Sequence, residues 1–269
     1  MMNKIFLIAE IGWNHLGDLN LAEKMIIEAA KNGADICKFQ SWDPDDLIKG
    51  DWDNDGRKEI YKKAALSIDD HEKLKRICDK NSVIFMTSIF HEKFINIVKD
   101  LDKSISKIPS HEIHNEELVK KMVESFDRTL ISTGASYWKE ILNYRELFNS
   151  GKLIPMHCVS SYPCIDENIN LPRIIKIKEI SQTYGYSGHL KNINDAIAAI
   201  CFGCQYIEKH FTIDKSLPGR DNLNAILPNE LKELHKFKLS FQKMNIDKGK
   251  DLQIEELDIY NNYRGRWGG

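Results

Sequence analysis

The amino-acid sequence predicts an α/β protein folded as a (β/α)8 TIM barrel. Eight short runs rich in β-branched and aromatic residues are spread along the chain, and segments with the apolar spacing of amphipathic helices lie between them. Strands that alternate with helices form a parallel sheet, because a parallel crossover needs a helix-length connection. Eight such units fit a closed barrel better than an open sheet.

The eight predicted strands follow one another at intervals that leave room for a helix after each. They are KIFLIAE from Lys4, ADICKFQ from Ala34, VIFMTS from Val83, SISKIPS from Ser104, RTLISTG from Arg128, LIPMHCVSSY from Leu153, YGYSGHL from Tyr184 and YIEKHFT from Tyr206.

The segments between the strands carry helix start signals. Asn20, with Glu23 three residues later, is predicted to open the first helix, and Ser67, with Asp70 in the capping-box position, opens another. The last helix is predicted from Asn229. Its apolar side comprises Leu231, Leu234, Phe237 and Phe241.

The domain organisation predicted from these elements is one catalytic barrel over residues 1–245 and a polar tail over 246–269. One long irregular insert, Asp43 to Lys63, is rich in Asp, Asn and Gly. It is a candidate lid over the barrel mouth or a solvated surface loop, and the sequence leaves both open.

Composition excludes several classes of function. The chain has 269 residues, 42 % hydrophobic and 29 % charged, and its 38 basic and 40 acidic residues give a net charge of −2. It has no Lys/Arg-rich block, so nucleic acid and anionic membranes are poor partners. We find neither a signal peptide nor a run of membrane-spanning length, which predicts a cytoplasmic protein.

The six cysteines lie in apolar surroundings, which favours buried thiols over a disulfide framework. Cys201 and Cys204 form a C-x-x-C inside a run that resembles a helix, with no second pair to complete a zinc site. Core packing is therefore the preferred interpretation, ahead of a redox or metal role.

Polar side chains end all eight predicted strands, and chemistry in a barrel sits at the carboxyl ends of its strands. A single strand-end lysine or histidine is usually structural, but charge at every strand end is costly without a function. In chain order these residues are Glu10, Lys38, Gln40, Ser88, Lys107, Ser110, Glu112, Ser132, Ser160, Tyr162, Ser187, His189, Glu208 and His210.

These residue types indicate two kinds of site at one mouth. Two lysines with several hydroxyls suit a compact anion that carries a phosphate and a carboxylate. Two histidines on neighbouring strands, His189 and His210, suit one divalent ion with open positions for substrate.

The same residues lie in motifs that resemble the sialic acid synthase family (N-acetylneuraminate synthase-like) from about Ile8 to Leu231. Seven motifs match in order, which makes the resemblance specific. They are AEIGWNHLGD from Ala9, ADICKFQ, KIPSHE from Lys107, STG from Ser132, CVSSYP from Cys158, YSGHL from Tyr186, and EKHFT with PGRD from Pro218.

The resemblance implies a role for each matched position. Lys38, Ser88, Lys107, Ser110, Ser132, Ser160 and Ser187 correspond to positions that bind phosphoenolpyruvate. His189 and His210 correspond to the ligands of a divalent metal, Mn²⁺ first and Mg²⁺ or Co²⁺ as alternatives. Glu10, Gln40, Glu112, Tyr162 and Asp221 correspond to positions that engage the sugar or assist proton transfer.

The sequence departs from the family pattern in four places. Ile89 stands at a usual proline, Gly188 at a frequent aspartate and His111 at a usual glycine. The first two are expected to alter packing, and His111 to crowd or contact the substrate. The family pattern includes an antifreeze-like C-terminal domain that contacts the sugar. We expect this chain to lack that domain, so Arg264 and Arg266 of the tail are candidates to replace its contact with the sugar.

The activity that this resemblance implies is the metal-assisted condensation of phosphoenolpyruvate with an N-acyl amino sugar aldehyde, giving a nonulosonic acid and phosphate. The alternatives are another metal-dependent aldolase-type or isomerase barrel and a non-catalytic sugar- or anion-binding relative. The acyl sugar and the oligomeric state stay open, with a homodimer among the options.

Overall fold

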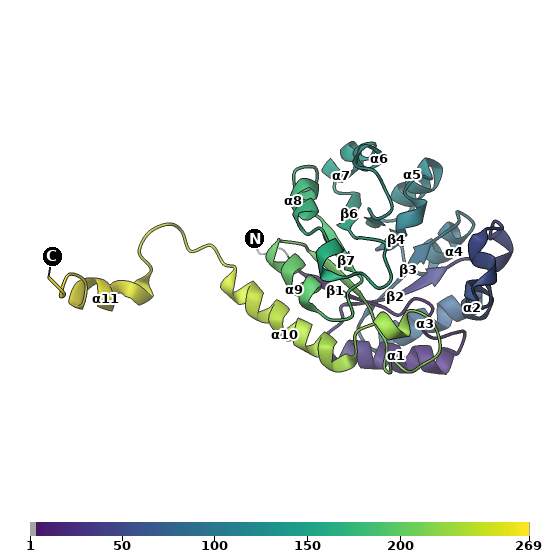
Figure 1. Ribbon diagram of the computed structural model, residues 1–269, viewed down its shortest axis with the longest axis horizontal. Helices are drawn as coiled ribbons and strands as arrows, with labels where there is room; N and C mark the ends of the chain where they lie inside the picture. Colours follow the sequence, from purple (N-terminus) through teal and green to yellow (C-terminus); the bar gives the residue numbers. More distant parts are fainter. Residues whose placement is uncertain (1–3, 269) are drawn as a thin grey trace.

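The computed structural model describes residues 4–268, and within them eight parallel strands close into a barrel in the order β1 to β8 (Figure 1). All eight predicted strands are present. Their bounds are β1 Phe6–Glu10, β2 Ile36–Ser41, β3 Ile84–Ile89, β4 Ser106–Ile108, β5 Thr129–Ser132, β6 Leu153–His157, β7 Gly185–Gly188 and β8 Tyr206–His210. The predicted (β/α)8 fold is confirmed.

Helices cover the outside of the barrel (Figure 1). They are α1 Leu19–Lys31, α2 Arg57–Ala64, α3 Ile68–Lys80, α4 Phe94–Leu101, α5 Glu116–Ser125, α6 Trp138–Leu142, α7 Arg145–Asn149, α8 Pro172–Lys178, α9 Asn194–Cys201 and α10 Pro228–Met244. A further helix, α11 Leu257–Asn262, lies in the tail.

Local sequence fixes where two of these helices begin. At α3 the predicted capping box is present, since Ser67 and Asp70 bond each other's backbone N–H. The predicted start of α1 at Asn20 was wrong by two residues. Asp18 is the cap, because its carboxylate accepts from the N–H groups of Asn20 and Leu21.

The barrel interior has an apolar floor beneath a polar mouth. The two-residue period of a strand places Ile8 below Glu10, Ile36 below Lys38 and Tyr206 below Glu208. The buried cluster that forms the floor comprises Ile8, Ile36, Met86, Ile105, Leu130, Ile154, Met156 and Tyr206. This packing closes the barrel from below, so the polar side chains open toward one end only.

The insert between β2 and α3 is more ordered than its composition suggested, because it contains α2 and two short 3-10 helices, η1 Pro44–Asp46 and η2 Asp51–Asn54. It packs along the rim of the mouth. The Tyr61 ring lies 5.2 Å from that of Trp13, Trp42 Nε1 donates to Tyr61 O at 3.1 Å, and Arg220 lies 3.0 Å from Asp55.

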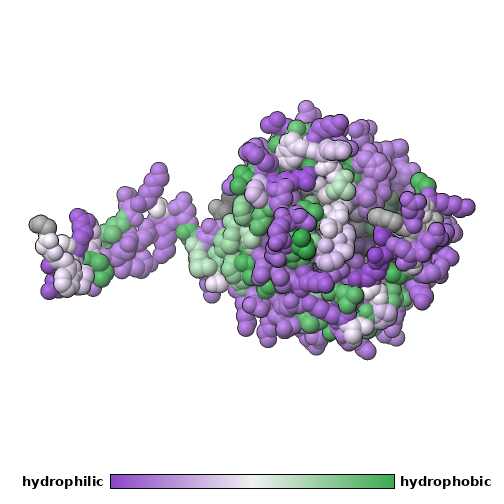
Figure 2. Space-filling model, viewed as in Figure 1, coloured by the Kyte–Doolittle hydropathy of each residue, from purple (hydrophilic) through white to green (hydrophobic). Residues whose placement is uncertain are grey.

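The tail after α10 extends away from the barrel and ends with α11 (Figure 1). Figure 2 shows a largely hydrophilic body on this face, with apolar atoms along the projecting tail. Exposed apolar side chains of the tail are Ile246, Leu252, Ile254, Leu257, Ile259, Tyr260, Tyr263 and Trp267.

Five of the six cysteines are buried, as expected. The exception is Cys201, the last residue of α9, which is exposed, so the core-packing prediction was wrong for that residue. Within residues 4–268 no helix combines the length and apolarity needed to cross a membrane.

Candidate active site

Four buried charged side chains meet at the carboxyl ends of β1, β2, β4 and β8. Lys107 Nζ lies 2.6 Å from Glu208 Oε1. Lys38 Nζ lies 3.0 Å from Glu10 Oε2 and 3.6 Å from Glu208 Oε2. We call these four residues the inner cluster. It brings together, as predicted, residues that are far apart in the sequence.

Neutral donors complete the inner cluster. Lys38 donates to Ser88 Oγ at 2.8 Å, Ser187 donates to Glu208 Oε1 at 2.9 Å, and Gln40 donates to Glu10 Oε1 at 2.7 Å. The second oxygens of the two carboxylates, Glu10 Oε2 and Glu208 Oε2, make no hydrogen bond of good geometry despite the nearby ammonium groups. The cluster therefore has bonding capacity left over.

The two carboxyl groups of the inner cluster differ in protonation. Burial raises the pKa of Glu10 to about 7, and Lys38 only partly opposes the rise. Burial also disfavours the charge of Glu208, but Lys107 and Lys38 outweigh it and lower its pKa to about 2. Near neutral pH, Glu208 is thus a fixed anion, whereas Glu10 can take up or release a proton.

The two predicted metal-ligand histidines face each other. The rings of His189 and His210 lie 5.7 Å apart, and the Tyr162 ring lies 4.2 Å from that of His189. Burial lowers the pKa of each imidazole to about 3, so both are neutral at pH 7. A 2.7 Å contact from His189 Nδ1 to Val159 O leaves Nε2 free to ligate a metal.

Asp221 joins this pair from the loop after β8. Its Oδ2 lies 3.5 Å from His210 Nδ1, a nitrogen that makes no hydrogen bond. Burial raises the pKa of Asp221 to about 6, and the neighbouring Trp13 and Arg220 only partly oppose the rise. Among the described residues no group of three or more His, Cys, Asp or Glu side chains has metal-binding geometry, so the protein offers two imidazoles rather than a full set of ligands.

The remaining predicted serines line the side formed by β4 to β6. Ser110 Oγ and Ser160 Oγ are 2.9 Å apart, and Ser132 and Ser160 both lie beside the buried Cys158 thiol. Gly134 allows this approach, because a Cβ there would lie 2.3 Å from Ser160 Oγ. The hydroxyls are therefore held together in one group.

Two predicted residues stay at the rim. Tyr162 is exposed, and Glu112 contacts Asn115 and has no contact with the inner cluster among those the structure describes. His111 is exposed and lies 4.9 Å from the Phe90 ring. Glu208 was predicted only as a polar strand-end residue without a role, although its two-residue spacing from His210 already placed both on one face.

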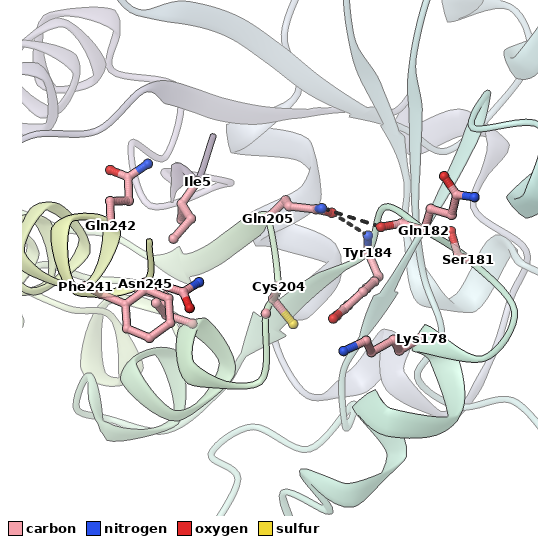
Figure 3. Close-up of a pocket in the computed structure, with 12 residues that line it drawn as sticks. Ile5, Lys178, Ser181, Gln182, Tyr184, Cys204, Gln205, Phe241, Gln242 and Asn245 are labelled. Carbon is pink, nitrogen blue, oxygen red and sulfur yellow. Dashed lines mark hydrogen bonds between the residues drawn. The ribbon is translucent and has the colours of Figure 1, made fainter. Parts of the chain in front are cut away.

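A separate cavity of about 480 Å³ lies at the opposite, amino-terminal end of the barrel (Figure 3). The cavity is lined by the end of α10 and by residues that precede β1, β7 and β8, namely Ile5, Tyr184, Cys204 and Gln205. It contains one charged side chain, Lys178, among the residues that line it. None of the predicted site residues lies there, so cavity size does not locate the site.

The closed barrel and the charged mouth define a class, the (β/α)8 enzymes whose site lies at the carboxyl ends of the strands. A family model described as the NeuB family matches residues 25–249. The chain therefore belongs to the NeuB family of phosphoenolpyruvate-dependent nonulosonic acid synthases, which are metal-dependent enzymes. The predicted family is confirmed.

Individual relatives agree with this assignment. The chain is 33 % identical over 250 residues to N,N'-diacetyllegionaminic acid synthase of Campylobacter jejuni, covering 87 % of this chain and 75 % of that one. It is 32 % identical to N-acetylneuraminate-9-phosphate synthase of Drosophila melanogaster, covering 87 % and 67 %.

A solved structure matches nearly the whole chain. The N-acetylneuraminic acid synthetase of Leptospira borgpetersenii, crystallised with citrate, superposes with a TM-score of 0.89 at 32 % identity. The match covers 98 % of this chain and 93 % of that one.

Proposed function

We propose that this protein condenses phosphoenolpyruvate with the open-chain aldehyde of an N-acyl amino sugar. The methylene carbon of phosphoenolpyruvate bonds to the aldehyde carbon, whose oxygen takes up a proton. Water then adds to the second carbon of phosphoenolpyruvate, and phosphate leaves as that carbon becomes a ketone. The observation that carries the proposal is the inner cluster. Two buried lysines lie there beside two carboxyl groups, each of which has one oxygen without a hydrogen bond of good geometry.

We assign the anion to the lysines and hydroxyls. Lys38 and Lys107 each have an ammonium group that an incoming phosphate or carboxylate can share with the glutamates. Ser88, Ser110, Ser132, Ser160 and Ser187 supply neutral donors around them. This arrangement contributes mainly by positioning the two reactants.

Glu10 is assigned as the base that activates water. Its pKa of about 7 is matched to proton transfer near neutral pH. Gln40 orients it by donating to Oε1, which leaves Oε2 to accept the proton. Glu112, Tyr162 and Asp221 are assigned to the sugar, since they surround the mouth above the inner cluster.

The imidazole pair fits a divalent metal. His189 and His210 are neutral, and the anchored Nδ1 of His189 leaves its Nε2 as a ligand atom. When bound, the ion supplies Lewis-acid polarisation of the aldehyde oxygen. We propose Mn²⁺, with Mg²⁺ or Co²⁺ as substitutes.

The test measures inorganic phosphate released from phosphoenolpyruvate with Mn²⁺ and a panel of N-acetylmannosamine and the diacetamido sugars of the legionaminic and pseudaminic series. We expect release that requires metal and one of these sugars. Tight binding of phosphoenolpyruvate without turnover on any sugar would instead indicate a non-catalytic relative.

The matched variants His189→Ala and His210→Ala separate metal chemistry from folding. Each should abolish metal-dependent phosphate release while the thermal midpoint stays close to that of the wild type. Full activity in either variant would remove the proposed metal site.

We further propose a cytoplasmic homodimer in which the tail, residues 246–269, contacts a second copy of the barrel (residues 1–245). The exposed Ile254, Leu257 and Trp267 support this, since none packs on its own barrel. Light scattering of the wild type and of Ile254→Asp/Trp267→Asp tests the dimer.

The tail also carries the two arginines proposed to contact the sugar. Arg264 and Arg266 lie over Tyr260 and Tyr263 of the same tail. An unchanged Michaelis constant for sugar in Arg264→Ala/Arg266→Ala would contradict a sugar contact.

A further inference from the structure

A second buried ion pair lies just outside the barrel wall, between β8 and α9. Lys209 follows Glu208, so strand alternation points it outward toward the helix that contains Asp195. Lys209 Nζ lies 3.0 and 2.9 Å from the two Asp195 oxygens and 2.8 Å from Leu190 O. The two side chains are 2 % and 0 % exposed.

This pair ties down the backbone beside both imidazoles. Leu190, which follows His189, donates its N–H to Asp195 Oδ2 at 3.4 Å, and its carbonyl oxygen accepts a hydrogen bond from Lys209 Nζ. Lys209 itself immediately precedes His210. The chain next to each imidazole is thus bonded to the same ion pair.

A glycine makes room for the carboxylate. Gly188 is paired with Lys209 in the β7–β8 register. A Cβ at position 188 would lie 2.3 Å from Asp195 Oδ2, too close for any real contact. The Asp195 carboxylate therefore occupies the volume that a side chain at 188 would need, on the strand that carries His189.

We propose that Asp195 and Lys209 are positioning residues that set the geometry of the His189–His210 pair and thereby its affinity for a divalent ion. The inference rests on the proposed function of that pair. It also implies that the carboxylate can come from either of two positions: from 195 with glycine at 188, or from 188 with a small residue at 195.

The first test measures Mn²⁺ affinity by calorimetry in the full chain without substrate. Asp195→Asn keeps the shape but removes the charge, and we expect its Kd for Mn²⁺ to rise about 10- to 100-fold, the usual effect of losing a group that orients metal ligands. The Michaelis constant for phosphoenolpyruvate should change much less.

The matched control is Asp35→Asn. Asp35 forms a lysine pair away from the mouth, 2.8 Å from Lys238 at the amino-terminal end of the barrel. It should lower the thermal midpoint but leave the Kd for Mn²⁺ within 2-fold of wild type. If Asp195→Asn behaves in the same way, the pair is merely structural and the proposal is wrong.

The exchange of positions gives a second, independent test. Gly188→Asp alone should weaken Mn²⁺ binding, because its side chain collides with Asp195. Gly188→Asp/Asp195→Ala should restore the Kd to within about 5-fold of wild type, since one carboxylate again faces Lys209. A double variant as defective as Gly188→Asp, or unable to fold, would overturn the proposal.

Histidine side-chain NMR separates this inference from the proposed function. The ¹H–¹⁵N signals of His189 and His210 in metal-free protein should shift in Asp195→Asn and stay in place in Asp35→Asn. Unmoved signals would contradict positioning even if the wild type is an active enzyme. Shifted signals would support it even if no sugar is turned over.

Discussion

Two neighbouring residues of β8 place buried charge on opposite sides of the barrel wall. Glu208 faces inward to Lys107 and Lys38, and Lys209 faces outward to Asp195. The outer ammonium bonds three oxygens, one for each of its N–H groups. On the inner side, Glu208 Oε2 and Glu10 Oε2 lack a hydrogen bond of good geometry, although Lys38 Nζ lies 3.0 Å from Glu10 Oε2.

The difference indicates that the buried charges of Lys209 and Asp195 support the fold, whereas those of the inner cluster are available to bind a ligand. A saturated pair has nothing to offer a substrate, and removing one partner leaves an uncompensated charge. An unsaturated cluster is costly to the empty protein, and such a cost is expected where binding or catalysis needs it. Variants on each side should therefore fail in different measurements.

The largest expected effect is on activity, from the inner side. Lys107→Met removes the ammonium 2.6 Å from Glu208 and with it a donor to the substrate anion. We expect kcat/KM for phosphoenolpyruvate to fall on the order of 10³-fold. The thermal midpoint should fall less than when a buried carboxylate loses its one cation, because Glu208 keeps a second ammonium group, Lys38 Nζ, 3.6 Å away. Retained activity would remove Lys107 from the site.

The matching effect on the outer side is on stability. Lys209→Met leaves the Asp195 carboxylate buried without its cation, which should lower the free energy of unfolding by about 3–5 kcal/mol. Urea denaturation measures it. Lys238→Met is the control and should cost less, because its partner Asp35 is 22 % exposed. Equal losses would show that saturation of the outer pair has no special weight.

The third effect is a pH dependence confined to the inner side. The pKa of Glu10 is about 7 in the folded chain against 4.5 ordinarily. The base is protonated below pH 7, so kcat/KM should rise with pH through about 7 and then level off. The folded state holds this proton more tightly than the unfolded chain, so the group's contribution to stability is greatest below pH 4.5 and is lost as pH rises through 7.

Glu10→Gln removes the titrating group and should abolish both trends. The measurements are the pH profile of phosphate release and the thermal midpoint between pH 5 and 8. A profile in Glu10→Gln that keeps the same limb near pH 7 would assign that limb to another residue.

Sequence patterns reached the inner side far better than the outer side. Strand alternation places Lys38 with Gln40, and Glu208 with His210, on one face of their strands, and both pairs share the mouth. Asp195 was not predicted, because no local sequence pattern indicates its role. Its contact with Lys209 depends on how α9 packs and on the missing Cβ of Gly188.

Local composition also misled at two places. The helix α2 was missed since RKEIYKKA has one strongly apolar residue, Ile60, and so no apolar stripe. Asn20 was taken for the cap of α1 because it precedes Glu23, whereas the carboxylate of Asp18 accepts two backbone N–H groups. Both errors concern positions where one tertiary or capping contact outweighs the pattern.

The smallest expected effect tests how finely the inner cluster is tuned. Ser187 donates to the Glu208 oxygen that also receives Lys107, at 2.9 Å. Ser187→Ala removes a hydroxyl that we assign to the substrate anion. A hydrogen bond to a charged group is worth roughly 1.5 kcal/mol, so the Michaelis constant for phosphoenolpyruvate should rise about 10-fold. Ser181→Ala, which loses a 2.6 Å bond to Thr183 O at the amino-terminal end of β7, is the control and should leave that constant unchanged. If both serines prove neutral, Glu208 is held by lysine alone, and the neutral donors around the inner cluster serve the fold rather than the substrate.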